Sequence, residues 1–210
     1  DLTLDLFSLI KMESEVTLEL NKIELFNEVI KGSACLFPTD TLPALASHPK
    51  YASQLWKLKK RPPNKALILM GANSDQLFEH VTEYALEDAI SMSRKHWPGA
   101  LTLVLPARGS LVSQLNIDSK TLGMRIPSLD LTRDFLSITG PLATTSANLS
   151  GSVPLLNAKE VSQCFKEIPC LGPSPWPYSS GLPSTVIEWE AKGVWKVLRE
   201  GAIKSNTLEL

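Results

Sequence analysis

An uninterrupted apolar run, ALILM at residues 66–70, constrains the fold of this chain most strongly. A run of this kind is typical of a strand that is covered on both faces. Residues 121–126 alternate between apolar and polar side chains, which also predicts a strand. Further apolar segments predict strands at residues 34–37, 101–105 and 142–143. Together these segments require a buried sheet.

Segments with a helical spacing of apolar residues separate the strands. The expected helices cover residues 18–30, 50–59, 82–95, 130–139 and 157–165. Gly32 and Gly140 stand where helices are expected to end. N-terminal caps are expected at Thr82, Asp130 and Asn157. Because strands alternate with helices, the chain is predicted to be an α/β protein with a sheet covered by helices.

The C-terminal part combines a long loop with a hairpin. Residues 169–183 contain five prolines and two glycines, which predicts a loop without regular structure. Loops of this length often act as lids, and we expect this one to close over a site. Residues 186–189 and 194–198 then predict a β-hairpin.

Composition limits the size and setting of the protein. The chain has 210 residues, 43% of them hydrophobic and 20% charged, which fits one globular domain. We expect an N-terminal extension at residues 1–17 and a domain at residues 18–206. The net charge of −1 provides no overall basic field for nucleic acid. The three cysteines form no zinc-ligand pattern, and no apolar run is long enough for a membrane span, so a cytoplasmic location is expected.

The most informative polar segment is TTSANLSG at residues 144–151, directly after a short apolar strand. Its side chains are mostly small. Ser146, Asn148 and Ser150 offer hydroxyls and an amide, and Gly151 allows a close approach of the backbone. A loop of this kind at the end of a strand can wrap an oxygen-rich ligand, and the alternative is a simple turn before the next helix.

Six other short motifs surround this loop in a fixed order. They are FPTDT at residues 37–41, KKRP at 59–62, WPG at 97–99, TLGMRIP at 121–127, GLPSTV at 181–186 and LREG at 198–201. With the loop, this set resembles the Sua5/YrdC/YwlC family, the threonylcarbamoyl-AMP synthases. The resemblance implies a single-domain, twisted mixed α/β sheet of the YrdC-like type, with helices on its faces and a concave substrate cleft.

The resemblance also implies a reaction of the nucleotidyltransferase class. L-threonine, bicarbonate or CO2, and ATP give threonylcarbamoyl-AMP and pyrophosphate, and the product supplies the t6A37 modification of tRNA. ATP is therefore expected as a substrate, together with Mg²⁺. Such a step requires charge neutralisation and alignment of the reactants, and no side-chain nucleophile is needed.

On the nucleotide side, the resemblance assigns catalytic roles to Lys59 and Arg61. The implied ATP contacts are Arg61, Asn64, Thr121, Ser146, Asn148 and Arg199. Arg61 can hold phosphate through two parallel N–H bonds, whereas Lys59 is expected to act as a mobile point charge. The alternative is that both cations belong to an exposed helix end.

On the amino-acid side, the resemblance assigns threonine contacts to Thr41, Arg125, Thr144 and Ser184, with Arg125 at the carboxylate. Thr121 and Arg125 share one face of a strand about 13 Å apart, a distance that could span an aminoacyl-adenylate-sized ligand. For Asp40, an Asx turn is favoured over a contact with Mg²⁺. No metal-ligating residue is assigned.

Three positions depart from the family's pattern. Pro43 stands where the family usually has an aromatic residue, Ala44 where it has glycine, and Met70 where many members have histidine. Proline fixes φ and lacks an N–H donor, so the local backbone is expected to differ. All three departures concern the amino-acid side of the site, so they bear on threonine specificity.

Two other functions remain open from the sequence. An RNA-binding module could use five cations to contact double-stranded RNA or tRNA, namely Lys57, Lys59, Lys60, Arg61 and Lys65. A carbamoyl transferase could use another acceptor in place of threonine. For the synthase itself, other proteins of the t6A pathway are possible partners.

Overall fold

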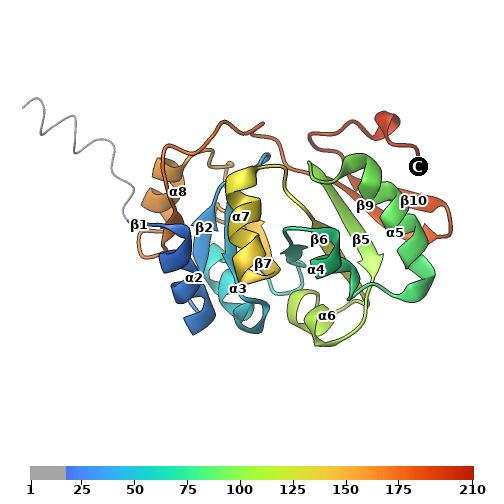
Figure 1. The fold of residues 1–210 in the computed structure, drawn as a ribbon, viewed down its shortest axis with the longest axis horizontal. Helices are drawn as coiled ribbons and strands as arrows, with labels where there is room; N and C mark the ends of the chain where they lie inside the picture. Colours follow the sequence, from blue (N-terminus) through green and yellow to red (C-terminus); the bar gives the residue numbers. More distant parts are fainter. Residues whose placement is uncertain (1–17) are drawn as a thin grey trace, which may run out of the picture.

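A ten-stranded mixed sheet forms the centre of the computed structural model, which describes residues 18–210 (Figure 1). The strand order is β1-β8-β2-β3-β7-β4-β6-β5-β9-β10. The strands are β1 (Glu19–Leu20), β2 (Cys35–Phe37), β3 (Ala44–Ser47), β4 (Ile68–Met70), β5 (Leu101–Pro106), β6 (Thr121–Arg125), β7 (Leu142–Ser146), β8 (Cys170–Leu171), β9 (Thr185–Ala191) and β10 (Val194–Arg199). The predicted α/β class is confirmed, and the predicted extension at residues 1–17 lies outside the described residues.

Seven α-helices and two short 3₁₀ segments accompany the described part of the sheet. The helices are α2 (Lys22–Lys31), α3 (Ser53–Lys59), α4 (Ser74–Phe78), α5 (Glu83–His96), α6 (Ser110–Leu115), α7 (Asp130–Thr139) and α8 (Ala158–Cys164). The 3₁₀ segments are η1 (Pro49–Tyr51) and η2 (Ser205–Thr207). Within residues 18–210, no helix has the length and apolar character that crossing a bilayer requires.

Most predicted elements are found close to their predicted bounds. The central run at residues 66–70 becomes β4, and the C-terminal hairpin forms from β9 and β10. Gly32 ends α2 with a left-handed φ of 111°, as its position predicts. The long loop is less irregular than expected, because β8 lies inside it and pairs with β1 and β2. The polar motif after residue 143 also begins as strand, since β7 continues to Ser146.

The predicted helix caps are only partly correct. Asn157 accepts a hydrogen bond from Glu160 N at 2.9 Å and caps α8. Thr82 occupies the cap position of α5, but its hydroxyl donates to Pro106 O instead. Asp130 is the first residue of α7, so the cap position falls on Leu129.

The two faces of the sheet are covered to different extents. One face packs its leucines, such as Leu69 and Leu103, against α3, α5, α6 and α8 in the larger core. The opposite face meets α2 and α7, which lie side by side over the half of the sheet near β2 and β7 (Figure 1). Met70 of β4 belongs to this second core and also lines a cavity. The part of this face that α2 and α7 leave uncovered is therefore open enough to hold the cavity.

The strand register shows which side chains reach that open face. Met70 is paired with Arg125 of β6, Thr102 of β5 with Val186 of β9, and Val186 with Arg199 of β10. Because Leu103 is paired with Met124, the same register places Thr102 opposite Arg125. Directly paired residues project from the same face of a sheet. One row across the open face therefore contains Arg125, Thr102 and Arg199 as well as the apolar Met70 and Val186.

Substitutions at two neighbouring residues of β4 test this difference between the faces. Leu69 is fully buried in the larger core, whereas Ile68 is partly exposed and lines the cavity. We expect Leu69→Ala to lower the free energy of unfolding by about 2–5 kcal/mol, because it leaves a gap in a packed core. Ile68→Ala should cost about 1 kcal/mol. Urea unfolding measures both, and equal losses would contradict the assignment of the faces.

Candidate functional site

A cavity of about 190 Å³ lies on the open face of the sheet. Its wall contains most of the residues that the sequence assigned to a site, namely Thr41, Arg61, Arg125, Thr144, Ser146, Ser184 and Arg199. They come from three separate strands, β6, β7 and β10, and from loops beside the sheet. In particular, Arg61 and Ser146 open into the same cavity. The fold thus brings the two sides of the predicted site together.

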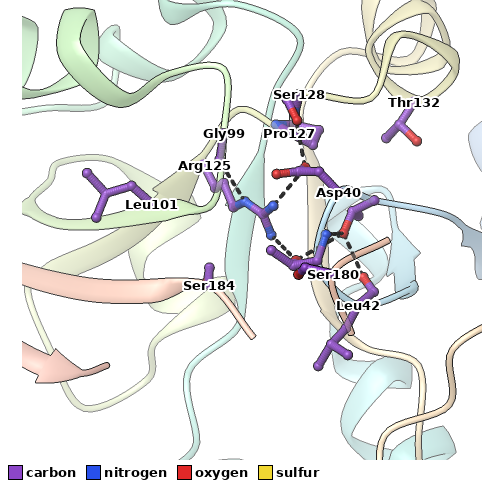
Figure 2. Close-up of polar contacts among 12 residues, drawn as sticks. Asp40, Leu42, Gly99, Leu101, Arg125, Pro127, Ser128, Thr132, Ser180 and Ser184 are labelled. Atoms are coloured by element: carbon purple, nitrogen blue, oxygen red, sulfur yellow. Dashed lines mark hydrogen bonds and ion pairs between the residues drawn. The ribbon is translucent and has the colours of Figure 1, made fainter. Parts of the chain in front are cut away.

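Arg125 is the most enclosed cation of the cavity, with 4% of its surface exposed. Its Nε donates to Gly99 O at 2.9 Å, and its Nη1 donates to Thr41 Oγ1 at 2.6 Å. Its Nη2 lies 2.8 Å from Asp40 Oδ1 (Figure 2). Arg125 therefore connects its own motif, TLGMRIP, to the FPTDT and WPG motifs.

The contact between Arg125 and Asp40 is an ion pair without a well-directed hydrogen bond. The distance is short, but Nη2 has no hydrogen-bond partner of acceptable geometry although it is buried. Burial lowers the pKa of Arg125, the Asp40 carboxylate opposes this shift, and the positive charge of Arg199 adds to it. The Asp40 carboxylate therefore balances the charge of Arg125 within the cavity wall.

Asp40 differs from the expected Asx turn. Its Oδ1 accepts a hydrogen bond from Ser128 N at 2.9 Å, far along the chain, in addition to the ion pair with Arg125 (Figure 2). Its main-chain oxygen accepts from Ser180 N at 3.2 Å. Ser180 belongs to the long proline-rich loop, which therefore lies against the site. Asp40 joins distant segments instead of capping its own turn.

Arg61 and Arg199 carry positive charge that no acidic side chain balances. Arg61 Nη2 donates to Ala66 O at 3.2 Å, and Arg199 Nη2 donates to Ser184 O at 2.8 Å. Within residues 18–210, neither arginine forms an ion pair with a carboxylate. Burial lowers the pKa of Arg61, and the charge of Arg199 lowers it further. This end of the cavity is suited to a polyanion such as a phosphate chain.

Lys59 is not the mobile charge that the sequence suggested. Its side chain is buried, and Nζ donates to Ser146 O at 2.7 Å, Ser146 Oγ at 3.1 Å, Asn148 O at 2.7 Å and Asn148 Oδ1 at 2.8 Å. Its own carbonyl accepts from Ser150 N at 2.9 Å. Burial lowers the pKa of Lys59 to about 8, and the charge of Arg61 adds to the effect. Lys59 therefore stabilises the TTSANLSG segment from behind the cavity.

Three further candidates lie away from the cavity wall. Asn148 is buried, and its side chain bonds to Lys59 and to Ser152 O. Asn64 is exposed in a turn. Thr121 shares a strand face with Arg125 as predicted, but its hydroxyl bonds to Ser119 Oγ at 2.9 Å. The geometry thus places Asn148 as a support of the loop and leaves Asn64 and Thr121 outside the pocket that Arg125 lines.

The cavity also contains residues that the sequence did not single out. Thr102 of β5 is buried and lines the cavity wall beside Arg125, its partner in the strand register. A threonine within the apolar strand at residues 101–105 was the signal that could have indicated it. Pro43, Ala44 and Met70, the three departures from the family's pattern, line the cavity as well. Their effect on the shape of the site is therefore direct.

Known proteins are similar to this chain in sequence and fold. A family model for Sua5, YciO and YrdC proteins, described as "Telomere recombination", matches residues 28–201. A threonylcarbamoyl-AMP synthase of Idiomarina loihiensis is 33% identical over 147 residues, which cover 68% of this chain and 79% of that protein. A threonylcarbamoyl-AMP synthase of Bacillus subtilis is 31% identical over 188 residues and 87% of this chain.

A solved structure shares the fold at similar coverage. The structure of P. abyssi Sua5 complexed with L-threonine has a TM-score of 0.81 and 25% sequence identity over 91% of this chain. The present chain spans 58% of that protein and 52% of the Bacillus subtilis protein. Some relatives are therefore considerably longer than this chain.

A substitution at Lys59 tests its role behind the loop. Lys59→Met removes the ammonium group that donates to four oxygens of Ser146 and Asn148, so we expect the free energy of unfolding to fall by about 3 kcal/mol. Amide hydrogen exchange should accelerate at residues 146–152. Lys57, on the same helix, is exposed, and Lys57→Met should change stability by less than about 0.5 kcal/mol. Equal losses for the two variants in urea unfolding would show that Lys59 is an ordinary surface cation.

Proposed function

The chain belongs to the Sua5/YciO/YrdC family, and from this premise we propose that it is an L-threonylcarbamoyladenylate synthase. The proposed substrates are L-threonine, bicarbonate or CO2, and ATP. The products are threonylcarbamoyl-AMP and pyrophosphate, which makes the enzyme a transferase of the nucleotidyltransferase type. The carrying observation is a single cavity whose wall holds the buried Arg125, paired with Asp40, together with Arg61 and Arg199, which form no ion pair within residues 18–210.

The two ends of the cavity suit the two kinds of substrate. At one end, Arg125 is paired with Asp40, so the local charge is balanced. A zwitterion such as an amino acid fits there, with its carboxylate toward the guanidinium group of Arg125. At the other end, Arg61 and Arg199 carry net positive charge beside the hydroxyl of Ser146, and this favours the triphosphate.

The proposed reaction has two balanced steps. The threonine ammonium and bicarbonate form a carbamate, a C–N bond replaces a C–OH bond, and water and a proton are released. One carbamate oxygen then attacks the α-phosphorus of ATP. The new O–P bond forms as the bond to the β-phosphate oxygen breaks, and its electron pair leaves with pyrophosphate. The protein contributes by holding two anions in line and by balancing their charge.

Mg²⁺ belongs to this proposal as a companion of ATP. Asp40 does not fit a metal ligand, because its Oδ1 is already engaged by Ser128 N and Arg125. Within the described part of the chain, no cluster of three or more histidine, cysteine or acidic residues could hold a metal. We therefore assign the ion to the phosphate oxygens and assign no protein ligand to it.

The cavity favours the enzyme over the RNA-binding alternative. Of the five cations proposed for RNA, Lys59 is buried and Arg61 opens into the cavity. Lys57, Lys60 and Lys65 remain exposed, and they are available for a tRNA contact that would accompany catalysis. The proposed product would pass to other components of t6A synthesis.

Pyrophosphate release provides the direct test of this function. Purified protein should release pyrophosphate from ATP only when L-threonine and bicarbonate are both present. ATP should also raise the melting temperature, because a ligand that binds only the folded state stabilises it. Folded protein that binds tRNA at low salt but releases no pyrophosphate would favour the RNA-binding module. Release that requires bicarbonate but a different acceptor would favour another carbamoyl transferase.

Substitutions at the two ends should separate the two substrates. Arg125→Met should raise the KM for L-threonine about 30-fold or more, with a smaller effect on the KM for ATP. Arg61→Met should do the reverse, because it removes a contact to phosphate. Arg108 is exposed and paired with Glu83 on the surface, so Arg108→Met is a matched control that should change neither constant.

Melting temperatures show whether the arginine variants remain folded, and Arg125→Lys keeps the charge if Arg125→Met does not fold. Equal increases in both KM values for both substitutions would contradict the assignment of separate ends.

A further inference from the structure

Two hydroxyl groups face each other in the wall of the cavity. Thr102 Oγ1 and Ser184 Oγ are 2.8 Å apart, and both residues line the cavity. Thr102 is 1% exposed and belongs to β5, and Ser184 is 8% exposed and precedes β9. The pair thus joins a rigid strand to the segment that leads into the hairpin.

The two hydroxyl groups together have one O–H donor that makes no hydrogen bond between them. Each hydroxyl carries one proton, and the bond between them uses only one of the two. Arg199 Nη2 donates to Ser184 Oγ at 3.3 Å and therefore supplies a further proton instead of accepting one. Within residues 18–210, neither hydroxyl has another hydrogen-bond partner. One O–H group is therefore available to a ligand in the cavity, whichever hydroxyl provides it.

The hydroxyl pair lies between the two ends of the site. The strand register places Thr102 opposite Arg125, and Ser184 bonds to the guanidinium of Arg199 through both Oγ and its main-chain oxygen. Figure 2 shows Ser184 and the Arg125 guanidinium within the same close-up of the site. In the strand register, Thr102 and Val186 separate Arg125 from Arg199 in one row across the sheet.

From this arrangement we propose that Thr102 and Ser184 form the subsite for the carboxylate that derives from bicarbonate. This inference rests on the proposed function. The carbamate carbon links the amino group of the amino acid to the oxygen that attacks the α-phosphorus. It must therefore lie between the amino-acid end at Arg125 and the phosphate end at Arg199. A carboxylate oxygen only accepts hydrogen bonds, so it matches a site with a free O–H donor between two cations.

The subsite acts on the first step of the reaction as well as the second. Bicarbonate and the threonine ammonium give the carbamate, water and a proton, and no oxidant or further reactant is required. The hydroxyl pair would hold one oxygen of bicarbonate during this step and the same oxygen of the carbamate afterwards. The other oxygen stays free to attack phosphorus.

The affinity for bicarbonate tests the subsite. Initial rates of pyrophosphate release would be measured in CO2-depleted buffer while bicarbonate, ATP and L-threonine are varied in turn. Thr102→Val keeps the shape of the side chain but removes the hydroxyl. We expect its KM for bicarbonate to rise about 10- to 100-fold, the loss of one hydrogen bond to a charged group, with the other two KM values within about threefold.

Two further variants separate binding from a structural effect. Thr102→Ser restores the hydroxyl and should return the KM for bicarbonate to within about threefold of the original value. Ser184→Ala should raise the KM for bicarbonate and also that for ATP, because Ser184 bonds to Arg199. Thr207→Val, an exposed threonine remote from the cavity wall, serves as the control.

The outcomes distinguish this inference from the proposed function. If the original protein needs bicarbonate but Thr102→Val leaves its KM unchanged, the subsite is wrong and the function stands. Equal increases in all three KM values without rescue by Thr102→Ser would indicate packing alone and would also overturn the subsite. If Thr102→Val does not fold, the KM for bicarbonate of Ser184→Ala and of Thr102→Ser tests the subsite instead. An original protein that releases no pyrophosphate with bicarbonate would reject the function and the subsite together.

Discussion

The buried ammonium group of Lys59 is the interaction on which the site depends. An isolated charge in a protein interior is strongly unfavourable, so it requires several well-placed acceptors. Here two residues of one segment, Ser146 and Asn148, supply four oxygens. The same contacts fix the end of β7, whose Ser146 reaches the cavity. Two residues after Lys59, the chain leaves α3 and Arg61 turns toward the cavity. One buried cation therefore positions both a hydroxyl and a second cation.

The position of the cavity follows from unequal coverage of the sheet. Five helices contribute residues to the larger core, whereas α2 and α7 cover only part of the opposite face. Side chains that project from the uncovered strands are free to be polar, because no helix has to pack on them. Gly123 lies on this face and is paired with Ile68, and an added Cβ there would meet Ile68 Cδ1 at 2.5 Å. The strand register, more than any single loop, thus determines which residues can contact a ligand.

The sequence predicted the regular elements better than the contacts between them. Strong apolar patterns located the run at residues 66–70 and the C-terminal hairpin, but β3 was missed because Pro43 and polar neighbours conceal its apolar residues. The family resemblance assigned Arg61, Arg125 and Ser146 to one site, and all three line the same cavity. It did not indicate that Lys59 is buried, because the direction of a long side chain depends on segments far away in the chain. The role of Asp40 was missed for the same reason, since its partners Arg125 and Ser128 are distant in sequence.

The charges of the two ends explain how one cavity can hold an amino acid and a nucleotide in order. The pair of Arg125 and Asp40 is close to neutral, so a zwitterion neither gains nor loses much from long-range charge there. Arg61 and Arg199 lack acidic partners, so a polyanion is drawn to their end. Pro43, Ala44 and Met70 are uncharged, and the strand register pairs Met70 with Arg125 and Ala44 with Ser146. Substitutions at these three positions can alter the shape of the amino-acid site without weakening the charge that orients the phosphates. The two substrates would keep their orientation, while the preference for the amino acid that accepts the carboxyl group would change.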